Sequence, residues 1–293
     1  MKPAAFAYFD PTTADEAVET LGELGDTGKV LAGGQSLVPM MNMRLAKPEA
    51  LVDINKVKEL AYIHEEDNSF VIGALTRQRA VERSRAVKRR SPLLAEAILS
   101  VGHLPIRSRG TVGGSLAHAD PAAELPAVLL ALDGWVEATS KRGTRRVAAA
   151  DLLLGPLLTS LEPDELLTRA CFPLLPAGSG TAFLEMTRRH GDFALVGVAA
   201  TVTLDAQGIC TRASVAILGA GETQVRAPQA EACLVSNRLD DSVIEDAGQA
   251  AMAGLDPIGD LHGSQEYRKQ VAGALTQRAL KIAWQRALPR SER

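Results

Sequence analysis

The 293-residue chain has only three cysteines, Cys171, Cys210 and Cys233, and no two of them are close in sequence. This spacing excludes a disulfide framework and a Cys-x-x-Cys metal site. It also excludes iron–sulfur clusters on this chain, because their thiolate ligands come in close groups. The sequence around each cysteine is apolar, so we expect buried, unreactive thiols.

Aromatic residues make up only 4% of the chain, so the core must consist mainly of Ala, Val, Leu and Ile. The net charge of -3 and the pI near 6.0 give no electrostatic reason to expect a nucleic acid or an anionic membrane as partner. No apolar run approaches the roughly 20 residues that cross a bilayer. The first residues also lack the apolar segment of a signal peptide. We therefore expect a cytoplasmic protein that neither binds nucleic acid nor inserts into a membrane.

The remaining composition, 46% hydrophobic and 23% charged, is typical of a soluble globular protein of one to three domains. The first part of the chain alternates between strand and helix patterns. A helix is predicted to begin at Thr13, with Glu16 as its capping-box partner, and Gly25 is predicted to end it. A short helical segment is expected over residues 40–45. The predicted strands are residues 6–9, 29–32 and 51–54.

A second block has a strand over residues 70–74, a helix capped by Thr76 and another helix that begins at Ser91-Pro92. His103 is expected to cap the C-terminal end of a helix. We predict a loop over residues 110–115. An apolar helix is predicted over residues 121–132, and a strand over 135–139.

From about residue 181 the pattern changes to an antiparallel meander, with strands predicted over 181–186, 194–204 and 213–218. Residues 227–286 show only helical patterns. The small-residue segment 176–180 is the clearest linker, and it places a domain boundary near residue 178.

Two glycine pairs are the candidate binding elements that the residues suggest before any family is considered. The first lies in Ala32, Gly33, Gly34, Gln35 and Ser36, and the second in Thr111, Val112, Gly113, Gly114 and Ser115. Backbone N–H groups at such turns can bind a pyrophosphate without a lysine, and glycine allows the close approach. A single Gly-Gly pair after a strand is more often a plain turn. The presence of two, each next to hydroxyl residues, weakens the plain-turn interpretation without removing it, so a plain turn and an anion site both stay open at this point.

One further segment, residues 215–221, looks like the start of a dinucleotide-binding fingerprint. Gln224 stands at its third glycine position, and Pro228 lies where the following helix should run. Both departures oppose a Rossmann site.

Around the two glycine pairs the sequence resembles the FAD-binding medium subunits of the molybdenum hydroxylases. This family includes flavoprotein subunits of carbon monoxide dehydrogenase and of bacterial dehydrogenases for nicotine, quinoline and purine-like substrates, and it is similar to the flavin domain of xanthine dehydrogenase. The matching segments are AGGQSL at 32–37, IRSRGTVGGSL at 106–116, HADPAAE at 118–124, RRHGDFALV at 188–196, and residues 219–227. They run in order through most of the chain and are together highly specific.

The resemblance implies an α+β fold of the vanillyl-alcohol-oxidase (PCMH) type followed by a C-terminal domain with an antiparallel sheet and helices. Residues 1–177 would form the FAD-binding domain, with subdomains over about 1–57 and 58–177. Residues 178–293 would form the C-terminal domain. The division found from the linker agrees with it.

The resemblance also implies the cofactor site. Glu124 takes the acidic position of the family and would bind a ribityl or ribose hydroxyl, while Val101 and Leu167 fall near apolar positions that contact the flavin rings. The pyrophosphate and ribityl chain would be wrapped by Leu31, Ala32, Gly33, Gly34, Gln35, Ser36, Leu37, Val38, Thr111, Val112, Gly113, Gly114 and Ser115. Neither glycine loop contains His or Cys, so we expect non-covalent FAD. No general acid or base is expected on this chain.

In such enzymes the substrate is oxidised at a molybdopterin cofactor on a large subunit, and two [2Fe-2S] clusters on a small subunit pass the electrons to FAD. The resemblance thus implies an electron-transfer subunit in a dimer of heterotrimers. Gln35 stands where the carbon monoxide enzymes usually have His, which favours an N-heterocycle or aldehyde substrate. Leu184 or Glu185 stands where the xanthine dehydrogenases have a flavin-tuning lysine, so that tuning is not expected.

Three alternatives remain open at this point. The chain could be the medium subunit of an aerobic carbon monoxide dehydrogenase. It could also be a stand-alone flavin oxidoreductase, which would turn over substrate by itself. The third alternative is a non-catalytic assembly subunit, in which the glycine loops would be empty turns and could lie far apart.

Overall fold

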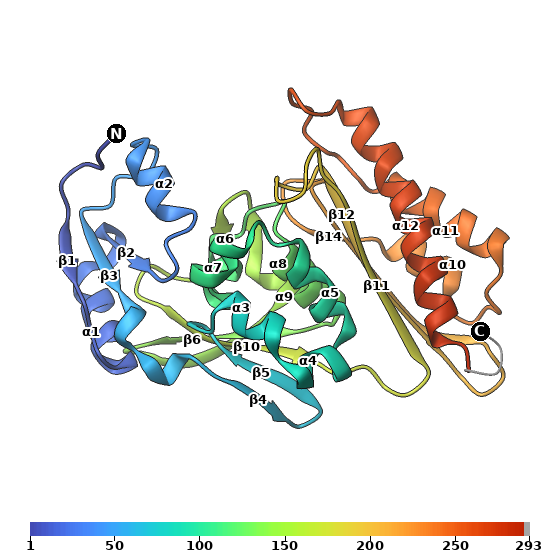
Figure 1. Cartoon of the computed structure of the whole chain (residues 1–293), viewed down its shortest axis with the longest axis horizontal. Helices are drawn as coiled ribbons and strands as arrows, with labels where there is room; N and C mark the ends of the chain where they lie inside the picture. Colours follow the sequence, from blue (N-terminus) through green and yellow to red (C-terminus); the bar gives the residue numbers. More distant parts are fainter. Residues whose placement is uncertain (290–293) are drawn as a thin grey trace.

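A computed structural model describes residues 1–289, so the last four residues of the expected C-terminal domain lie outside the described part. The elements form three units along the long axis of the molecule (Figure 1). The first unit has a parallel sheet of order β1-β3-β2, formed by β1 (Ala7–Phe9), β2 (Gly28–Leu31) and β3 (Ala50–Asp53). Helix α1 (Ala14–Leu24) connects β1 to β2, and α2 (Leu37–Asn42) follows β2.

The start of α1 follows from local sequence: Thr13 is its N-cap, as predicted, but the Glu16 side chain, predicted to complete a capping box with Thr13, accepts from the Thr12 amide at 2.7 Å instead. The Thr13 hydroxyl accepts a hydrogen bond from the Glu16 amide at 3.2 Å, and Gly25 is the C-cap. The buried face of α1, with Val18 and Leu21, packs in one cluster with Val52 of β3. Leu166 of the second unit belongs to the same cluster, so α1 joins the two units through apolar contact.

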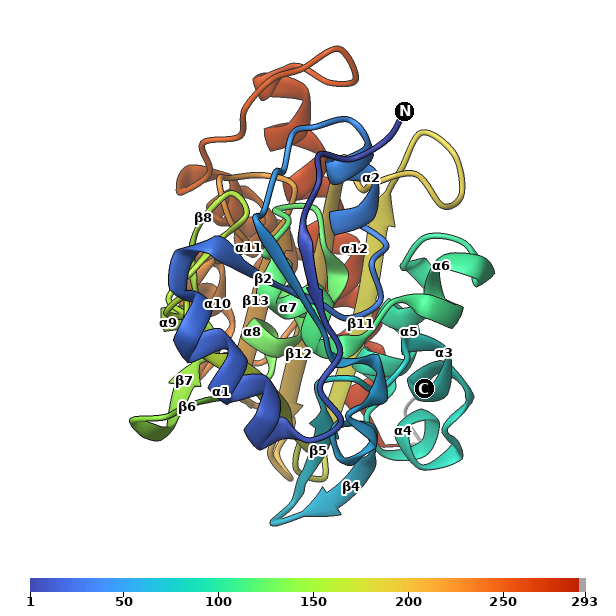
Figure 2. The same cartoon turned by 90° about the vertical axis from the view of Figure 1, so that its left-hand side faces the viewer.

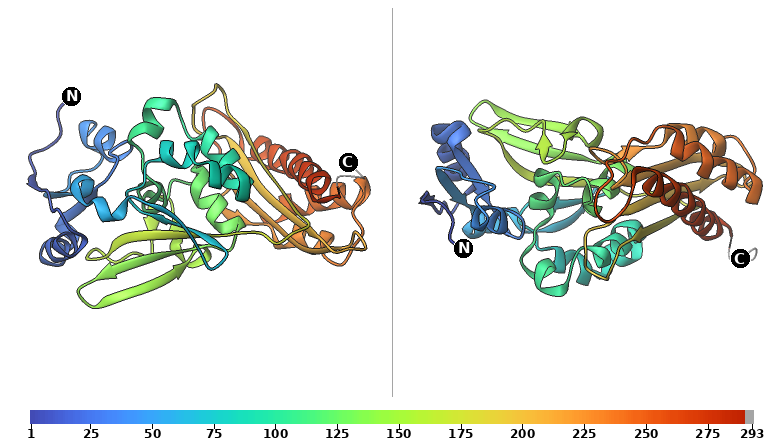
Figure 3. Two further views of the ribbon diagram at one scale, coloured as in Figure 1. Left: turned by 60° about the horizontal axis from the view of Figure 1, so that its bottom comes forward. Right: turned by 90° about the horizontal axis from the view of Figure 1, so that it is seen from above.

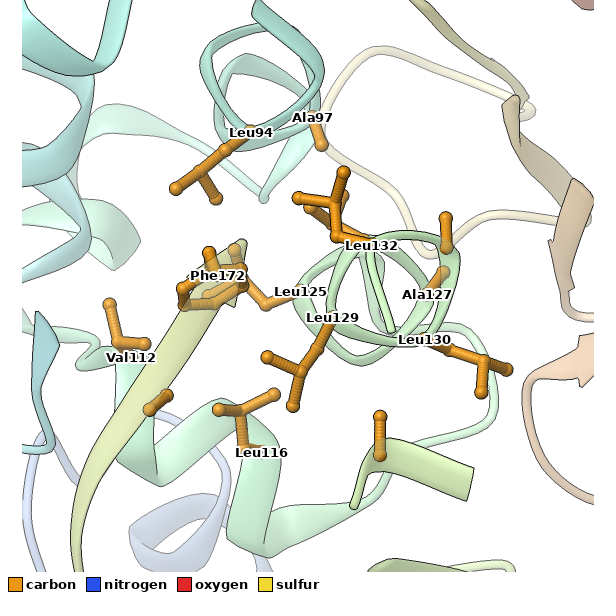
Figure 4. Close-up of a cluster of buried hydrophobic side chains, with 14 of the residues drawn as sticks. Leu94, Ala97, Val112, Leu116, Leu125, Ala127, Leu129, Leu130, Leu132 and Phe172 are labelled. Atoms are coloured by element: carbon orange, nitrogen blue, oxygen red, sulfur yellow. The ribbon is translucent and has the colours of Figure 1, made fainter. Parts of the chain in front are cut away.

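The second unit is built on an antiparallel sheet of order β4-β5-β10-β6-β7. Helices cover one side of this sheet, and the core lies between them (Figure 4). There α7 places Val112 and Leu116 near Leu125 and Leu129 of α8, and Phe172 of the sheet lies among them next to Leu125. The strands of this unit are β4 (Ile63–Glu66), β5 (Ser69–Gly73), β6 (Trp135–Ser140), β7 (Gly143–Ala148), β8 (Leu153–Gly155), β9 (Leu158–Thr159) and β10 (Leu166–Pro173). Its helices are α3 (Gln78–Arg83), α4 (Arg85–Arg90), α5 (Pro92–Ser100), α6 (Leu104–Arg109), α7 (Val112–His118), α8 (Glu124–Ala131) and α9 (Ala149–Leu152).

The third unit is an antiparallel sheet of order β11-β12-β13-β14, followed by helices, as the meander pattern predicted. Its strands are β11 (Ser179–Met186), β12 (Val196–Leu204), β13 (Cys210–Leu218) and β14 (Val225–Arg226). Its helices, α10 (Pro228–Leu234), α11 (Asp241–Ala253) and α12 (Gln265–Ala287), cover one face, and α5 and α8 pack on the other (Figure 3). Because β13 pairs antiparallel with both its neighbours, the rejected dinucleotide fingerprint does not lie in a parallel nucleotide-binding sheet.

Three local predictions were wrong. Residues 112–115 of the expected loop form the first turn of α7, because the Thr111 hydroxyl caps the helix and Gly113 packs on Ala74. Thr76 is not an N-cap, because its hydroxyl bonds the Tyr62 backbone instead and Arg77 precedes α3. His103 lies at the N-cap of α6 rather than at a helix C-terminus.

The cysteine prediction holds for two of the three thiols. Cys171 and Cys210 are buried, whereas Cys233 is partly exposed on α10, where its thiol contacts the Gln229 carbonyl. The predicted domain boundary stays a prediction, since the core around Phe172 also includes Phe183 from beyond it. Among residues 1–289, no helix is both long and apolar enough to span a bilayer.

Candidate functional site

The first glycine loop leaves the C-terminal end of β2 and enters α2. Gly34 has a φ of 71°, the left-handed region that favours glycine, so the loop turns sharply there. The Gln35 side chain fixes the turn by donating to the Gly33 carbonyl at 3.0 Å. Ser36 precedes α2, and its side chain makes no cap hydrogen bond.

The backbone amides of this loop are free to bind a ligand. Within residues 1–289, the amides of residues 33–37 donate no hydrogen bond; the next one, Val38, donates to the Gly34 carbonyl. A run of five consecutive unpaired donors at the start of a helix favours an anion with several oxygens. The loop therefore has the donors that a pyrophosphate needs.

The second glycine pair works differently from what the sequence suggested. The amides of Val112, Gly113 and Ser115 donate to the backbone carbonyls of Thr76, Ala74 and Thr111 at 2.9–3.2 Å. The Gly114 amide donates to the Thr111 hydroxyl at 3.0 Å. These four amides are thus already paired within the chain and offer no free donor. What this turn contributes is a backbone without side chains at Gly113 and Gly114, which a ligand can approach closely.

The two glycine loops lie against each other, as the path from β2 to α7 shows in Figures 1 and 2. A Cβ on Gly33 would lie 2.4 Å from the Arg109 carbonyl oxygen, so this glycine touches the backbone just before the second loop. A Cβ on Gly114 would lie 3.8 Å from the Cβ of Ala32. The arrangement with distant loops, which would favour an assembly subunit, is therefore not found.

A polar network that the sequence analysis missed holds the two loops in place. Asn55 donates to the Ala32 carbonyl at 2.7 Å and accepts from Arg77 at 2.6 Å, while Arg77 also donates to the Arg109 carbonyl. Asp53 accepts from the Asn55 amide at 2.9 Å and from the Tyr8 hydroxyl at 2.6 Å. Burial alone would raise the pKa of Asp53, but these hydrogen bonds outweigh it and lower the pKa. Single polar residues after strand ends carry no sequence signal for such a network.

The other predicted site residues lie in the second unit. Glu124 is the first residue of α8 and is partly buried, and its pKa is raised to about 8 by burial and then by the charges of Glu185 and Asp120. Val101 and Leu167 are buried in the core around Phe172, with 8% and 5% of their surface exposed. Their assigned contact with flavin rings stays a prediction.

A buried arginine holds the segment between α5 and α6 in place. Arg107 of α6, 9% exposed, donates to the Val101 and Gly102 carbonyls at 2.9 and 2.8 Å and to Glu82 at 2.9 Å. Burial would raise the pKa of Glu82, but the hydrogen bonds and charges of Arg107 and Arg79 outweigh it and lower the pKa. The pair thus fixes the segment between α5 and α6.

Replacing Arg107 by methionine should destabilise the protein by about 3 kcal/mol, because it leaves the buried Glu82 carboxylate short of a partner. Folding lowers the pKa of the Glu82 carboxyl group, so its ionised form stabilises the folded protein above the ordinary pKa of a glutamate. This stabilisation is lost as the pH falls from that ordinary pKa through the lowered one. The gap between wild type and Arg107→Met should therefore shrink in acid. Urea unfolding at neutral and acidic pH measures it.

The matched control is Arg90→Met, which removes an ion pair with Glu65 at the surface. We expect this variant to lose no more than about 1 kcal/mol. Equal losses for the two variants would contradict the role given to Arg107.

The residues present fit FAD. Five free amides suit its pyrophosphate, and a Cβ on Gly33 would collide with the Arg109 carbonyl next to them, so only glycine keeps the two loops this close. One carboxylate oxygen of Glu185 is buried and without a hydrogen-bond partner among residues 1–289, as expected of a group that faces a ligand. Across the same residues, no group of three His, Cys, Asp or Glu side chains is placed to hold a metal ion.

Comparison with known protein families gives two matches that together cover most of the chain. Residues 4–175 match the model of the FAD binding domain in molybdopterin dehydrogenase. Residues 181–283 match the CO dehydrogenase flavoprotein C-terminal domain.

Individual proteins match over their whole length. The chain is 46% identical to the alpha subunit of the 6-hydroxypseudooxynicotine dehydrogenase complex of Paenarthrobacter nicotinovorans, covering 100% of this chain and 99% of that one. It is 36% identical to the carbon monoxide dehydrogenase medium chain of Hydrogenophaga pseudoflava, covering 98% and 99%. A solved structure of that organism's carbon monoxide dehydrogenase, in a form lacking the Mo-pyranopterin moiety of the molybdenum cofactor, superposes with a TM-score of 0.95 at 38% identity, covering 98% of this chain and 99% of that one.

Proposed function

Because the chain belongs to the family of FAD-binding medium subunits of the molybdenum hydroxylases, we propose that it is the flavin station of an electron-transfer complex. Its relatives are subunits of dehydrogenases, and its fold is the FAD-binding domain followed by the C-terminal domain of that family. The observation that carries the proposal is the free run of amides in residues 33–37 beside the second glycine loop. Bound FAD would accept electrons from a partner and release them to an external acceptor.

The residues of this chain bind and orient the cofactor. Residues 31–38 would hold the pyrophosphate through backbone donors, and residues 111–115 would allow the ribityl chain to approach closely. Glu124 would accept a hydrogen bond from a ribityl or ribose hydroxyl. Asn55 and Arg77 would keep the two loops at a fixed separation through their hydrogen bonds, because supporting bonds of this kind hold a binding site in its productive geometry.

The proposed partners are a large molybdopterin subunit and a small subunit with two [2Fe-2S] clusters, in a cytoplasmic dimer of heterotrimers. The cysteine content supports this division, because three dispersed thiols, two of them buried, cannot ligate a cluster. The names of the relatives support it too, since they are an alpha subunit of a complex and a medium chain.

For the substrate of the complex we propose an N-heterocycle or an aldehyde. Gln35 supports this choice, as does the higher identity to the relative named for 6-hydroxypseudooxynicotine, 46%, than to the one named for carbon monoxide, 36%. Carbon monoxide remains the second candidate, because the fold superposes on that enzyme with a TM-score of 0.95.

Purification of the native complex tests these proposals together. We expect two further subunits, molybdenum and iron on metal analysis, and a flavin spectrum whose absorbance disappears on addition of substrate without external acceptor. A chain that purifies alone and oxidises substrate would instead be a stand-alone oxidoreductase. A colourless chain that refuses added FAD would be an assembly subunit. Either outcome would overturn the proposal.

A further inference from the structure

The β13–β14 loop, residues 219–224, contains the two glycines of the segment that looked like a dinucleotide-binding fingerprint. It lies against the α7–α8 turn, residues 119–123. This turn joins the helix that begins at the second glycine pair to the helix that begins at Glu124, and α8 contacts both α7 and β14 (Figure 1). The proposed function assigns no role to this loop, although it contacts the segment that directly follows α7.

Both ends of the β13–β14 loop donate hydrogen bonds to the α7–α8 turn. The Gly219 amide donates to the Pro121 carbonyl at 2.9 Å. The Gln224 side-chain nitrogen donates to the Asp120 and Ala123 carbonyls, at 2.7 and 3.0 Å. Because both partners are carbonyl oxygens, the side-chain amide can make these bonds in one orientation only. Gln224 is 4% exposed, so its bonds are shielded from water.

The loop is fixed from the side of the third unit as well. Gly219 has a φ of 71°, and a Cβ there would lie 2.5 Å from the Leu195 carbonyl oxygen, so glycine is required. Arg268 of α12, 7% exposed, donates to the Gly219 carbonyl at 3.1 Å and to the Leu195 carbonyl. It also donates to Asp260 at 2.8 Å. The loop therefore connects a buried arginine of the third unit to the α7–α8 turn of the second.

The stability of the turn alone does not explain the amide of Gln224. Its Oε1 is buried and has no hydrogen-bond partner among residues 1–289, which is unfavourable for the fold. The Asp120 carbonyl also accepts from the Ala123 amide at 2.9 Å, and the Ala123 carbonyl stands at the N-cap of α8, where it takes the first helical hydrogen bond. The turn thus closes without Gln224. What the amide adds is a fixed position of this turn relative to the third unit.

The path from this turn to the glycine loops is short. Helix α7 joins the turn to the second glycine pair, and its seven residues span about 10 Å at 1.5 Å per residue. At the far end of α7, a Cβ on Gly114 would lie 3.8 Å from the Cβ of Ala32. A displacement of α7 along its axis therefore reaches the first loop and the free amides of residues 33–37.

We propose that Gln224 is a positioning residue for the flavin site, and that its bonds to the α7–α8 turn couple FAD binding to closure of the β13–β14 loop. Gln224 acts through the turn and α7, not by contact with the cofactor. The proposal rests on the proposed function, since it takes FAD to be the ligand of the glycine loops. It gives the rejected fingerprint segment a role as a connection between two units of the chain.

The coupling has to be reciprocal. If FAD binds more tightly when the closed loop holds α7 in place, then bound FAD must favour the closed loop by the same factor. We expect a factor of about ten, within the usual range of coupling between two sites. The loss of FAD affinity when the loop is released and the gain in loop protection when FAD binds should therefore agree.

The test is hydrogen–deuterium exchange with and without FAD, together with FAD titration, on the full chain in the assembly in which it purifies. In wild type, FAD should slow exchange about tenfold in the β13–β14 loop, in addition to its effect on residues 31–38. In Gln224→Met, which keeps a side chain of similar length, FAD should still slow exchange in residues 31–38. In the β13–β14 loop of this variant, FAD should change the rate by less than about twofold, and the dissociation constant of FAD should rise about tenfold.

Gln207→Met is the matched control, because it makes the same change in the exposed turn before β13, at the opposite end of that strand. It should keep the wild-type FAD affinity and the wild-type protection. A purely structural role of Gln224 would speed exchange equally with and without FAD and leave the effect of FAD on the loop intact.

That result, or an unchanged FAD affinity in Gln224→Met, would overturn the coupling while leaving FAD binding in place. The wild-type measurement stands even if Gln224→Met fails to fold, since a β13–β14 loop whose exchange ignores bound FAD would overturn the coupling by itself. Wild type that binds no FAD would overturn the proposed function instead.

Discussion

Gly114→Val should purify without flavin. In α7, a Cβ at this position would lie 2.7 Å from the Thr111 hydroxyl oxygen that caps the helix and 3.8 Å from the Cβ of Ala32, so the methyl groups of valine would press on the first loop. The cap would be lost at a cost of about 1 kcal/mol. The larger effect is that the valine methyl groups would push the two glycine loops apart and displace the free amides of residues 33–37. The measurement is the ratio of flavin to protein after gel filtration.

A graded series separates the two effects. Gly114→Ala disturbs only the cap and should keep part of its flavin. Gly155→Ala is the control, since a Cβ there meets only Leu158 at 3.9 Å, and it should keep the wild-type flavin content. A Gly114→Val protein that still binds flavin stoichiometrically would remove the second loop from the site.

Gly33→Ala should weaken FAD binding by at least about 100-fold, equivalent to ~2.7 kcal/mol. The added Cβ would lie 2.4 Å from the Arg109 carbonyl oxygen and 2.8 Å from the Cα of Gly110. Backbone atoms cannot rotate away as a side chain can, so the two loops must separate. That movement would break the hydrogen bond from Asn55 to the Ala32 carbonyl and displace the free amides of residues 33–37. Fluorescence titration with FAD measures the loss.

The variant should also lose about 1–3 kcal/mol of folding free energy through overpacking, so its fold must be checked by thermal unfolding. Gly221→Ala serves as the control, because a Cβ there meets its neighbours at 3.4 Å, at the edge of ordinary contact. A folded Gly33→Ala protein with unchanged FAD affinity would show that the first loop does not contact the cofactor.

Much of the fold could be predicted from sequence because it depends on local contacts. The Thr13 cap and the apolar face of α1 require residues only three or four positions apart, and both are found as predicted. The meander from β11 to β13 follows from alternation and turns. The start of α7 was missed, because two adjacent glycines have low helix propensity. The bond from Gly113 to the Ala74 carbonyl, together with the Thr111 cap, outweighs that propensity.

For the site, the sequence by itself determined which segments could bind a diphosphate cofactor and that this chain could not carry iron–sulfur clusters. Both conclusions depend on residue type: glycine where a Cβ would obstruct, and cysteine too sparse to form a ligand set. Only the tertiary structure decided that the free donors belong to the first loop and not the second, and that Asn55 and Arg77 hold the loops together. The reason is physical: whether an amide or a carboxylate is free depends on partners that are distant in sequence, and only folding brings them within hydrogen-bond distance.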